Sequence, residues 1–354
     1  MGPDPSVEPA QAVPGGIPDP PPFDAPVAAV WRGDLMESIH RGRYVVCDAR
    51  GETLYSLGDP GGYVYLRSTA KLFQALPLVF SGAADELGIA GEELAVACAS
   101  HSGEPRHLAA VRSILRKAGL SEDDLQNGTH PPMHTLTAAR LARNGEKPRA
   151  IHGNCSGKHA SMLAVCAHAG WDTHTYRDPE GPLQVLVRRT VAKLCDLEPE
   201  AVRLAGDNCG VPVFATPLRN LALGFARLAA GGAEDFPDDL QEAVQRVRDA
   251  MRAHPYMVAG TGRFDTKLME ATDLVAKSGA EAVFAAASPG TPSWGLALKI
   301  SDGAPRAVAP AVLAALARRG VWVPHEMKEG VVTDLNGEVV GKVSPQTSFS
   351  QKTY

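Results

Sequence analysis

The pattern of apolar and polar positions predicts strands at the start of the chain. The segment Val30–Arg43 is polar, and the first predicted strand, Tyr44–Asp48, follows it. Thr53–Leu57 returns after an Arg-Gly turn, which predicts a β-hairpin. A further strand-like run, Tyr63–Leu66, leads into the apolar segment Leu72–Phe80, which predicts a helix that stops at a Ser-Gly pair.

Helical periodicity dominates the middle of the chain, from Glu92 to about Gly232, and one more helix follows it. Polar loops separate the helices, and one of these loops is Leu204–Pro212. The predicted helices are Arg106–Ala118, Thr135–Asn144, Ala160–His168, Pro182–Leu194, Leu218–Ala230 and Leu240–His254.

Strand patterns return near the C-terminus. Leu274–Phe284 is expected to form two strands, or one strand bent around Gly279. The other predicted elements are a helix at Phe264–Ala271, a strand at Trp294–Ile300, a helix at Pro310–Arg319 and a hairpin at Val331–Val343. If the N- and C-terminal strands share one antiparallel sheet, the helical middle forms a second lobe. The cleft between the two lobes is then the natural place for a functional site.

The length of 354 residues suits one large domain. We expect a sheet lobe (about 27–67 and 258–343) and a helical lobe (about 68–257), which together make a single catalytic domain over 27–343. The Pro-rich residues 1–26 predict a disordered tail, and 344–354 form a C-terminal tail.

Composition and charge exclude several classes of protein. Charged residues make up 21% of the chain and the net charge is −5, so neither nucleic acid nor an anionic membrane is expected as a partner. No apolar run approaches the length of a membrane helix, and the N-terminus lacks the pattern of a signal peptide. Four cysteines lie in apolar runs and are expected to be reduced core thiols, which fits a cytoplasmic protein.

A possible nucleophile and its base lie at the start of the first predicted helix. Ser68 and Lys71 are three residues apart, so both side chains project from one face of a helix. A lysine whose pKa is lowered by burial or by neighbouring cations can take the proton of a serine hydroxyl. The spacing alone equally fits a helix-capping serine followed by a solvated lysine.

Two further elements follow in an informative order. Ser100 lies in a loop of the helical region, and Lys277 lies in a Lys-Ser-Gly strand near the C-terminus. Serine β-lactamases and penicillin-binding proteins use this order of Ser-x-x-Lys, serine-containing loop and Lys-Ser/Thr-Gly. The order therefore predicts the β-lactamase-like fold, with an antiparallel sheet from the N- and C-terminal strands and a large helical middle.

A second set of residues suggests a metal site. Cys155 and Cys209 offer two thiolates, with Lys158 and Asp207 nearby in the sequence, and this set is compatible with Zn²⁺. The spacing is not that of a zinc finger, and ordinary loop cysteines are the alternative. Arg67 and Arg263 are candidates for binding a carboxylate.

Several longer motifs then carry a resemblance to a known family. From about Val27 to Val343, the chain resembles the thermolabile, Rhizobium-type L-asparaginases, also called class 3 or asparaginase II-like proteins. The motifs are Arg32-Gly33 with Glu37-Ser38 and His40-Arg41-Gly42, Arg67–Lys71 with Phe73–Pro77, Cys98–Gly103, Asn154–Ala160, Asp207–Pro212 and Gly260–Arg263.

The resemblance implies a homodimer that hydrolyses L-asparagine to L-aspartate and ammonia. It implies two Ser–Lys tandems, Ser68 with Lys71 and Ser100 with a later lysine. That lysine is Lys277 or Lys267, and Lys277 is preferred because it lies in the Lys-Ser-Gly strand. The resemblance also implies a zinc ion bound by Cys155, Lys158 and Cys209, and substrate-binding residues that we place at Arg67, His101, Asp207 and Arg263.

The expected mechanism is attack by Ser68, activated by Lys71, on the side-chain amide of asparagine, followed by hydrolysis of the aspartyl ester. Whether Ser68 or Ser100 makes the first attack stays open at this point. A β-lactamase or D,D-peptidase activity is a second reading, and a non-catalytic, zinc-stabilised binding protein is a third. Where the family pattern has a cysteine before a Gly-x-His loop, this chain has Asn127.

Overall fold

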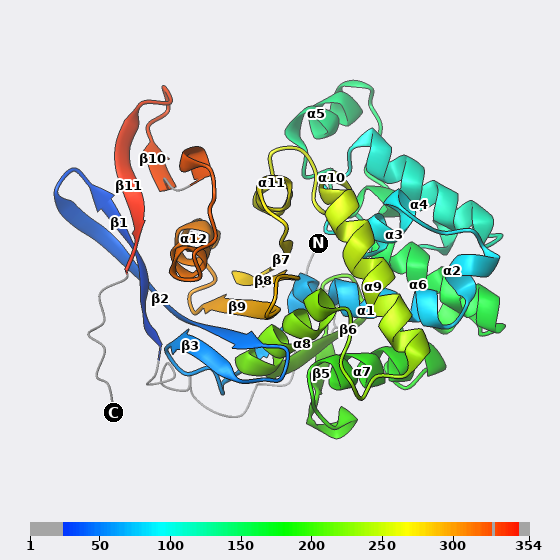
Figure 1. The fold of residues 1–354 in the computed structure, drawn as a ribbon. Helices are drawn as coiled ribbons and strands as arrows, with labels where there is room; N and C mark the ends of the chain where they lie inside the picture. The colour runs from blue at the N-terminus through cyan, green and yellow to red at the C-terminus, as the bar shows by residue number, and fades with distance from the viewer. Residues whose placement is uncertain (1–23, 328–329, 347–354) are drawn as a thin grey trace, which may run out of the picture.

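The computed structural model describes residues 24–327 and 330–346, and its largest element is an antiparallel sheet of eight strands (Figure 1). The strand order is β10-β11-β1-β2-β9-β8-β7, and β3 pairs with β2. N- and C-terminal strands therefore share one sheet, as predicted. The strands are β1 (Ala25–Arg32), β2 (Leu35–Asp48), β3 (Thr53–Leu57), β7 (Val275–Gly279), β8 (Val283–Ser288), β9 (Trp294–Ile300), β10 (Gly330–Thr333) and β11 (Val339–Pro345).

Both predicted hairpins are present, and Leu274–Phe284 resolves into two strands, β7 and β8. The polar segment Val30–Arg43, for which no strand was predicted, lies within β1 and β2 except for a turn at 33–34. The N-terminal half of β2 pairs with β1 and is largely exposed, so it shows no apolar pattern. The predicted tails mostly fall outside the described residues. Ala25-Pro26 and Ser344-Pro345, however, belong to β1 and β11.

A second, three-stranded sheet lies within the helical region. Its order is β4 (Tyr63–Tyr65), β6 (Pro212–Pro217) and β5 (Arg203–Gly206). The predicted loop Leu204–Pro212 is therefore wrong at both ends, where it enters β5 and β6. These strands are too short to show a sequence period, and their pairing comes from partners distant in sequence.

The segment between β4 and β7 is mostly helical, as predicted. A 3₁₀ turn, η1 (Arg67–Ala70), runs directly into α1. The helices are α1 (Lys71–Phe80), α2 (Ala83–Glu86), α3 (Glu92–Ala97), α4 (Pro105–Lys117), α5 (Thr135–Arg143), α6 (Ser156–Ala169), α7 (Pro182–Leu194), α8 (Leu218–Ala230), α9 (Asp238–Ala253), α10 (Pro255–Val258), α11 (Phe264–Ala271) and α12 (Val308–Arg318).

Helices cover both faces of the large sheet (Figure 1). α8 and α12 lie on opposite sides of it, and α8 approaches β9 at Gly295. A Cβ there would lie 2.1 Å from the carbonyl oxygen of Ala222, so only glycine fits. Since α1 packs against α6, α7 and α9, and β7 packs against η1, the start of α1 lies where the sheet meets the helices.

In the described ranges 24–327 and 330–346, none of the helices combines the length and the apolar character needed to cross a bilayer.

Candidate active site

The entry into α1 is held firmly in place. The backbone N–H of Leu66 donates to the carbonyl of Phe214 in β6 at 2.8 Å, and the Thr69 hydroxyl donates to the carbonyl of Leu66 at 2.6 Å. Arg67 has a φ of +48°, a left-handed conformation that is costly for a residue with a side chain. Its guanidinium donates to Asp207 at 3.1 Å, and this contact across the two segments compensates for the strain.

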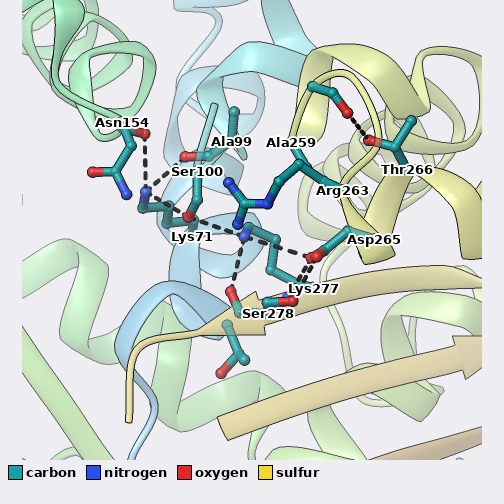
Figure 2. Close-up of polar contacts among 12 residues, drawn as sticks. Lys71, Ala99, Ser100, Asn154, Ala259, Arg263, Asp265, Thr266, Lys277 and Ser278 are labelled. Carbon is teal, nitrogen blue, oxygen red and sulfur yellow. Dashed lines mark hydrogen bonds and ion pairs between the residues drawn. The ribbon is translucent and has the colours of Figure 1, made fainter. Parts of the chain in front are cut away.

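Lys71 is buried, with 1% of its surface exposed, and three oxygens surround its Nζ. These are the carbonyls of Ala99 at 2.7 Å and Asn154 at 3.3 Å, and the Ser100 hydroxyl at 2.9 Å (Figure 2). Burial lowers the pKa of Lys71. In the neutral amine, two N–H groups can donate to two of these oxygens, which leaves one lone pair to accept a proton.

Lys277 approaches the same hydroxyl from β7 (Figure 2). Its Nζ lies 3.0 Å from Ser100 Oγ and 2.9 Å from the carbonyl of Ser278. Burial lowers the pKa of Lys277 to about 7. Lys267, the alternative from the sequence, is exposed on α11. The structure therefore brings Lys277 to Ser100, and a single hydroxyl links the two buried amines.

Ser68 occupies a different position from Ser100. It lines a cavity of about 400 Å³, whereas Ser100 is only 5% exposed and is not among the lining residues. Across the described residues, no side-chain hydrogen bond joins Ser68 to Lys71, whereas the backbone N–H of Lys71 donates to the carbonyl of Ser68. The cavity is lined by Arg67, Ser68, Asn127, His130, Met133, Gly153, Asn154, Cys155, Asp207, Asn208, Cys209 and Ala280.

The predicted metal ligands lie together beside this cavity. Lys158 is 1% exposed, and its Nζ lies 3.1 Å from the sulfur of Cys209. A hydrogen bond from the Cys209 thiol, with the charges of nearby lysines, holds the pKa of Cys155 well below its usual range. Burial alone would lower the pKa of Lys158, but the sulfurs of Cys155 and Cys209 have the larger combined effect, and the pKa is raised. Two clustered thiols, one of them disposed to ionise, are donors of the kind that Zn²⁺ accepts, whereas the Lys158 amine must first lose its proton to join them.

Two predicted substrate-binding residues lie in less direct positions. His101 is fully buried and is not among the residues that line the cavity. Its ring accepts a hydrogen bond from the Gly103 N–H at 3.1 Å and contacts the Ser156 hydroxyl at 2.8 Å, so it braces two loops. Arg263 caps α11, and its guanidinium contacts the sulfur of Met133, which lines the cavity, at 3.6 Å.

Sequence reasoning missed three residues that make polar contacts with Arg67, Lys71, Ser278 or Lys277. Asn208 accepts a hydrogen bond from Arg67 at 2.9 Å, and Asn154 offers its carbonyl to Lys71. Both belong to motifs already quoted for the family resemblance, which was the available signal. Asp265 contacts Ser278 and lies 3.9 Å from Lys277 Nζ. No sequence pattern marked it, because its partners are distant along the chain.

Comparisons with known proteins bear on this geometry. A sequence model of the L-asparaginase II family matches residues 28–345, nearly the whole chain. No curated protein matches the chain.

A search of solved structures also found similar chains. A Bacillus glutaminase is 11% identical, with 79% of this chain and 91% of that chain covered at a TM-score of 0.39. A β-lactamase from Mycobacterium bovis is 15% identical, with 79% and 95% covered, also at 0.39. A structure described as Mglu is 16% identical, with 79% and 67% covered, at 0.38. At these identities and TM-scores the likeness says nothing about the chemistry of this chain.

The match of the family model over residues 28–345 is different in kind, because it covers the sheet, the helical region and every segment that lines the cavity. The chain therefore belongs to the L-asparaginase II family and is an amidohydrolase of the asparaginase type.

Proposed function

We propose that the protein hydrolyses L-asparagine to L-aspartate and ammonia, with Ser68 as the nucleophile. The observation that carries the proposal is the pair of buried lysines on one serine, Ser100. One of them, Lys71, contacts the carbonyl of Asn154, which lines the same cavity as Ser68. A volume of about 400 Å³ suits a small amino-acid substrate. Membership of the L-asparaginase II family supports the choice of amide.

In the first step the Ser68 oxygen bonds to the side-chain amide carbon of asparagine, and the serine proton passes to the Lys71 amine. Protonated Lys71 then delivers this proton to the departing nitrogen, which leaves as ammonia when the C–N bond breaks. A water molecule adds to the resulting aspartyl ester and gives up a proton to the same amine. The bond between the acyl carbon and the Ser68 oxygen then breaks, and the protonated amine returns the proton to that oxygen, which releases aspartate.

Ser100 completes the route for protons. Its oxygen is 2.9 Å from Lys71 Nζ and 3.0 Å from Lys277 Nζ, so it can pass a proton between the two amines. The low pKa of Lys277, which results first from its burial, makes this amine a proton acceptor near neutral pH.

The negative charge that develops on the amide oxygen in the transition state must be stabilised by hydrogen-bond donors. We assign the backbone N–H groups of Ser68, at the start of the helix, and of Ala280, just after β7. Ala280 lines the cavity, and β7 runs so close to η1 that a Cβ on Gly279 would lie 3.4 Å from the Ser68 nitrogen.

At the other end of the substrate, asparagine carries a positive α-ammonium group and a negative α-carboxylate group. Asp207 lines the cavity and offers a carboxylate to the α-ammonium group, while Arg67 and Arg263 offer guanidinium groups to the α-carboxylate. Arg67 and Asp207 already bind each other, so the substrate meets a pre-oriented pair.

Zn²⁺, when bound, would be held by Cys155, Lys158 and Cys209, and it would orient an α-group of the substrate, since two thiolates weaken its Lewis acidity. Lys158 must lose its proton to become a ligand, so metal binding is expected to release protons.

We also propose a cytoplasmic homodimer. The six cysteines are free thiols, as a reducing compartment requires. Exposed apolar residues on β2 and β11, including Leu35 and Val339, offer an apolar surface for a second copy. Light scattering coupled to size exclusion measures the mass directly, and a monomer at micromolar concentration would contradict the dimer.

The function is tested by ammonia release from asparagine, from glutamine and without substrate, with and without a chelator. Ser68→Ala should abolish release from asparagine. Ser113→Ala, on α4 away from the cavity, is the matched control and should retain it. Turnover of a chromogenic β-lactam in place of asparagine would favour the β-lactamase reading, and bound metal without any turnover would favour the non-catalytic one.

A further inference from the structure

We propose that Asp265 is a positioning residue that holds the strand carrying Lys277 and places a fixed negative charge behind that amine. The inference rests on the proposed function, in which Lys277 accepts protons through Ser100. It assigns no contact with substrate to Asp265, which in the described part of the chain is not among the residues lining the cavity of Ser68.

Asp265 lies in the first turn of α11 and is 1% exposed. Both of its carboxylate oxygens are directed at one residue of β7. One accepts the backbone N–H of Ser278, and the other accepts the Ser278 hydroxyl at 2.5 Å (Figure 2). A carboxylate held by two donors from one residue has a fixed orientation, so α11 and β7 are joined at the residue next to Lys277.

The distance from Asp265 to Lys277 is longer than a hydrogen bond. Oδ1 of Asp265 lies 3.9 Å from Nζ, whereas Ser100 and the Ser278 carbonyl lie within 3.0 Å of it. The carboxylate therefore leaves the lysine protons directed at Ser100 and acts on Lys277 through its charge. A direct hydrogen bond to the carboxylate would instead compete with Ser100 for the same amine.

The surroundings of Lys277 explain why this charge is needed. Lys277 is 1% exposed, and burial of an unpaired ammonium is costly. Asp265 is the only carboxylate among the groups in the described residues that act on its charge. Two cations lower the pKa of Lys277, namely Lys71 from α1 and Arg263 at the cap of α11. Asp265 from α11 and Cys155 before α6 raise this pKa. The Cys98 thiol after α3 and the neutral Ser100 hydroxyl also face the amine.

Removal of the carboxylate charge has a definite sign. Asp265→Asn keeps the shape but takes away the charge that stabilises protonated Lys277, so the pKa of this amine falls further. A unit charge at 3.9 Å corresponds to a shift of about one to three pH units, from water-like to protein-like screening. The acidic limb of the pH profile of kcat should move down by this amount, and plateau kcat should fall because a weaker base takes protons less readily. KM should stay close to the wild-type value, because Asp265 does not line the cavity.

The experiment compares wild type, Asp265→Asn and Asp265→Glu in ammonia release from asparagine across pH, after thermal unfolding has shown that each variant is folded. Asp265→Glu keeps the charge and should leave the acidic limb near its wild-type position. An acidic limb that stays in place in Asp265→Asn, or that moves equally in both variants, would overturn the inference. A rise in KM with unchanged kcat would also overturn it.

Two further measurements cover other outcomes. If Asp265→Asn does not fold, Ser278→Ala is the alternative, because it removes one hydrogen-bond donor to Asp265 and keeps both Asp265 and Lys277. In this variant kcat should fall, while the acidic limb of the pH profile stays in place. A kcat equal to that of wild type would refute the anchoring role. If wild type releases no ammonia, the proposed function fails but the inference is still tested. The ¹³Cε resonance of Lys277, assigned with Lys277→Arg, should titrate at lower pH in Asp265→Asn, and an unchanged titration would refute it.

Discussion

The close passage of β7 past η1 makes Gly279→Ala an informative change. An added Cβ would lie 3.1 Å from the carbonyl oxygen of Leu66, 3.3 Å from Arg67 Cβ and 3.4 Å from the nitrogen of Ser68. These contacts are too tight by a few tenths of an ångström, and Leu66 is anchored to Phe214 by a backbone hydrogen bond of 2.8 Å. Overpacking of this kind costs about 1–3 kcal/mol of unfolding free energy.

The same displacement moves the proposed nucleophile. Since misplacement of a reacting group by about 1 Å can cost roughly 100-fold in rate, a shift of a few tenths should lower kcat about 3–10-fold. Urea denaturation and ammonia release measure the two effects. Gly206→Ala is the matched control, because Gly206 also lies in a strand and a Cβ added there would meet nothing within 4 Å. Wild-type kcat and stability in Gly279→Ala would refute the packing of β7 against Ser68.

Four further predictions concern the lysines and the thiols. Lys277→Ala should lower kcat about 10²–10⁴-fold, and Lys267→Ala, on the exposed face of α11, should leave it unchanged; equal losses in both would contradict the assignment. Wild-type kcat should rise as pH rises through about 7, where Lys277 loses its proton, and a profile flat from pH 5 to 9 would argue against this amine. The pKa of Lys277 is lower in the folded chain than in the unfolded one, so the unfolded state binds more protons between about pH 7 and the ordinary lysine pKa of 10.5. The unfolding free energy should therefore rise with pH in this window, by up to about 1.4 kcal/mol per pH unit. Urea denaturation should show a shallower rise in Lys277→Met, and identical slopes would contradict the burial of a titrating amine. Cys155→Ser should lower the zinc measured by mass spectrometry of the purified protein, and an unchanged zinc content would exclude Cys155 as a ligand.

Local patterns predicted the elements that depend on local contacts. The predicted helices Pro182–Leu194, Leu218–Ala230 and Phe264–Ala271 have the bounds seen in the structure, because an amphipathic face and its end signals lie within each segment. The missed elements depend on distant partners. The exposed half of β2 and the short strands β5 and β6 form because other strands supply their hydrogen bonds.

The candidate site divides in the same way. Ser68 and Lys71 were found by spacing, since one helical turn joins them. Spacing alone did not decide between Lys277 and Lys267, and only the fold shows that β7 carries Lys277 to Ser100. No sequence pattern identified Asp265, because its role arises from a contact between α11 and β7, which are joined only in the fold.

The central claim is that Ser68, and not Ser100, carries the aspartyl group. Acid quenching during turnover of asparagine, followed by peptide mass spectrometry, locates that ester directly. We predict the aspartyl modification on the peptide at Ser68 and its loss in Ser68→Ala, while Lys277→Ala, which leaves Ser68 and Lys71 in place, still forms it slowly. An aspartyl group on Ser100 in the wild-type protein would contradict the account.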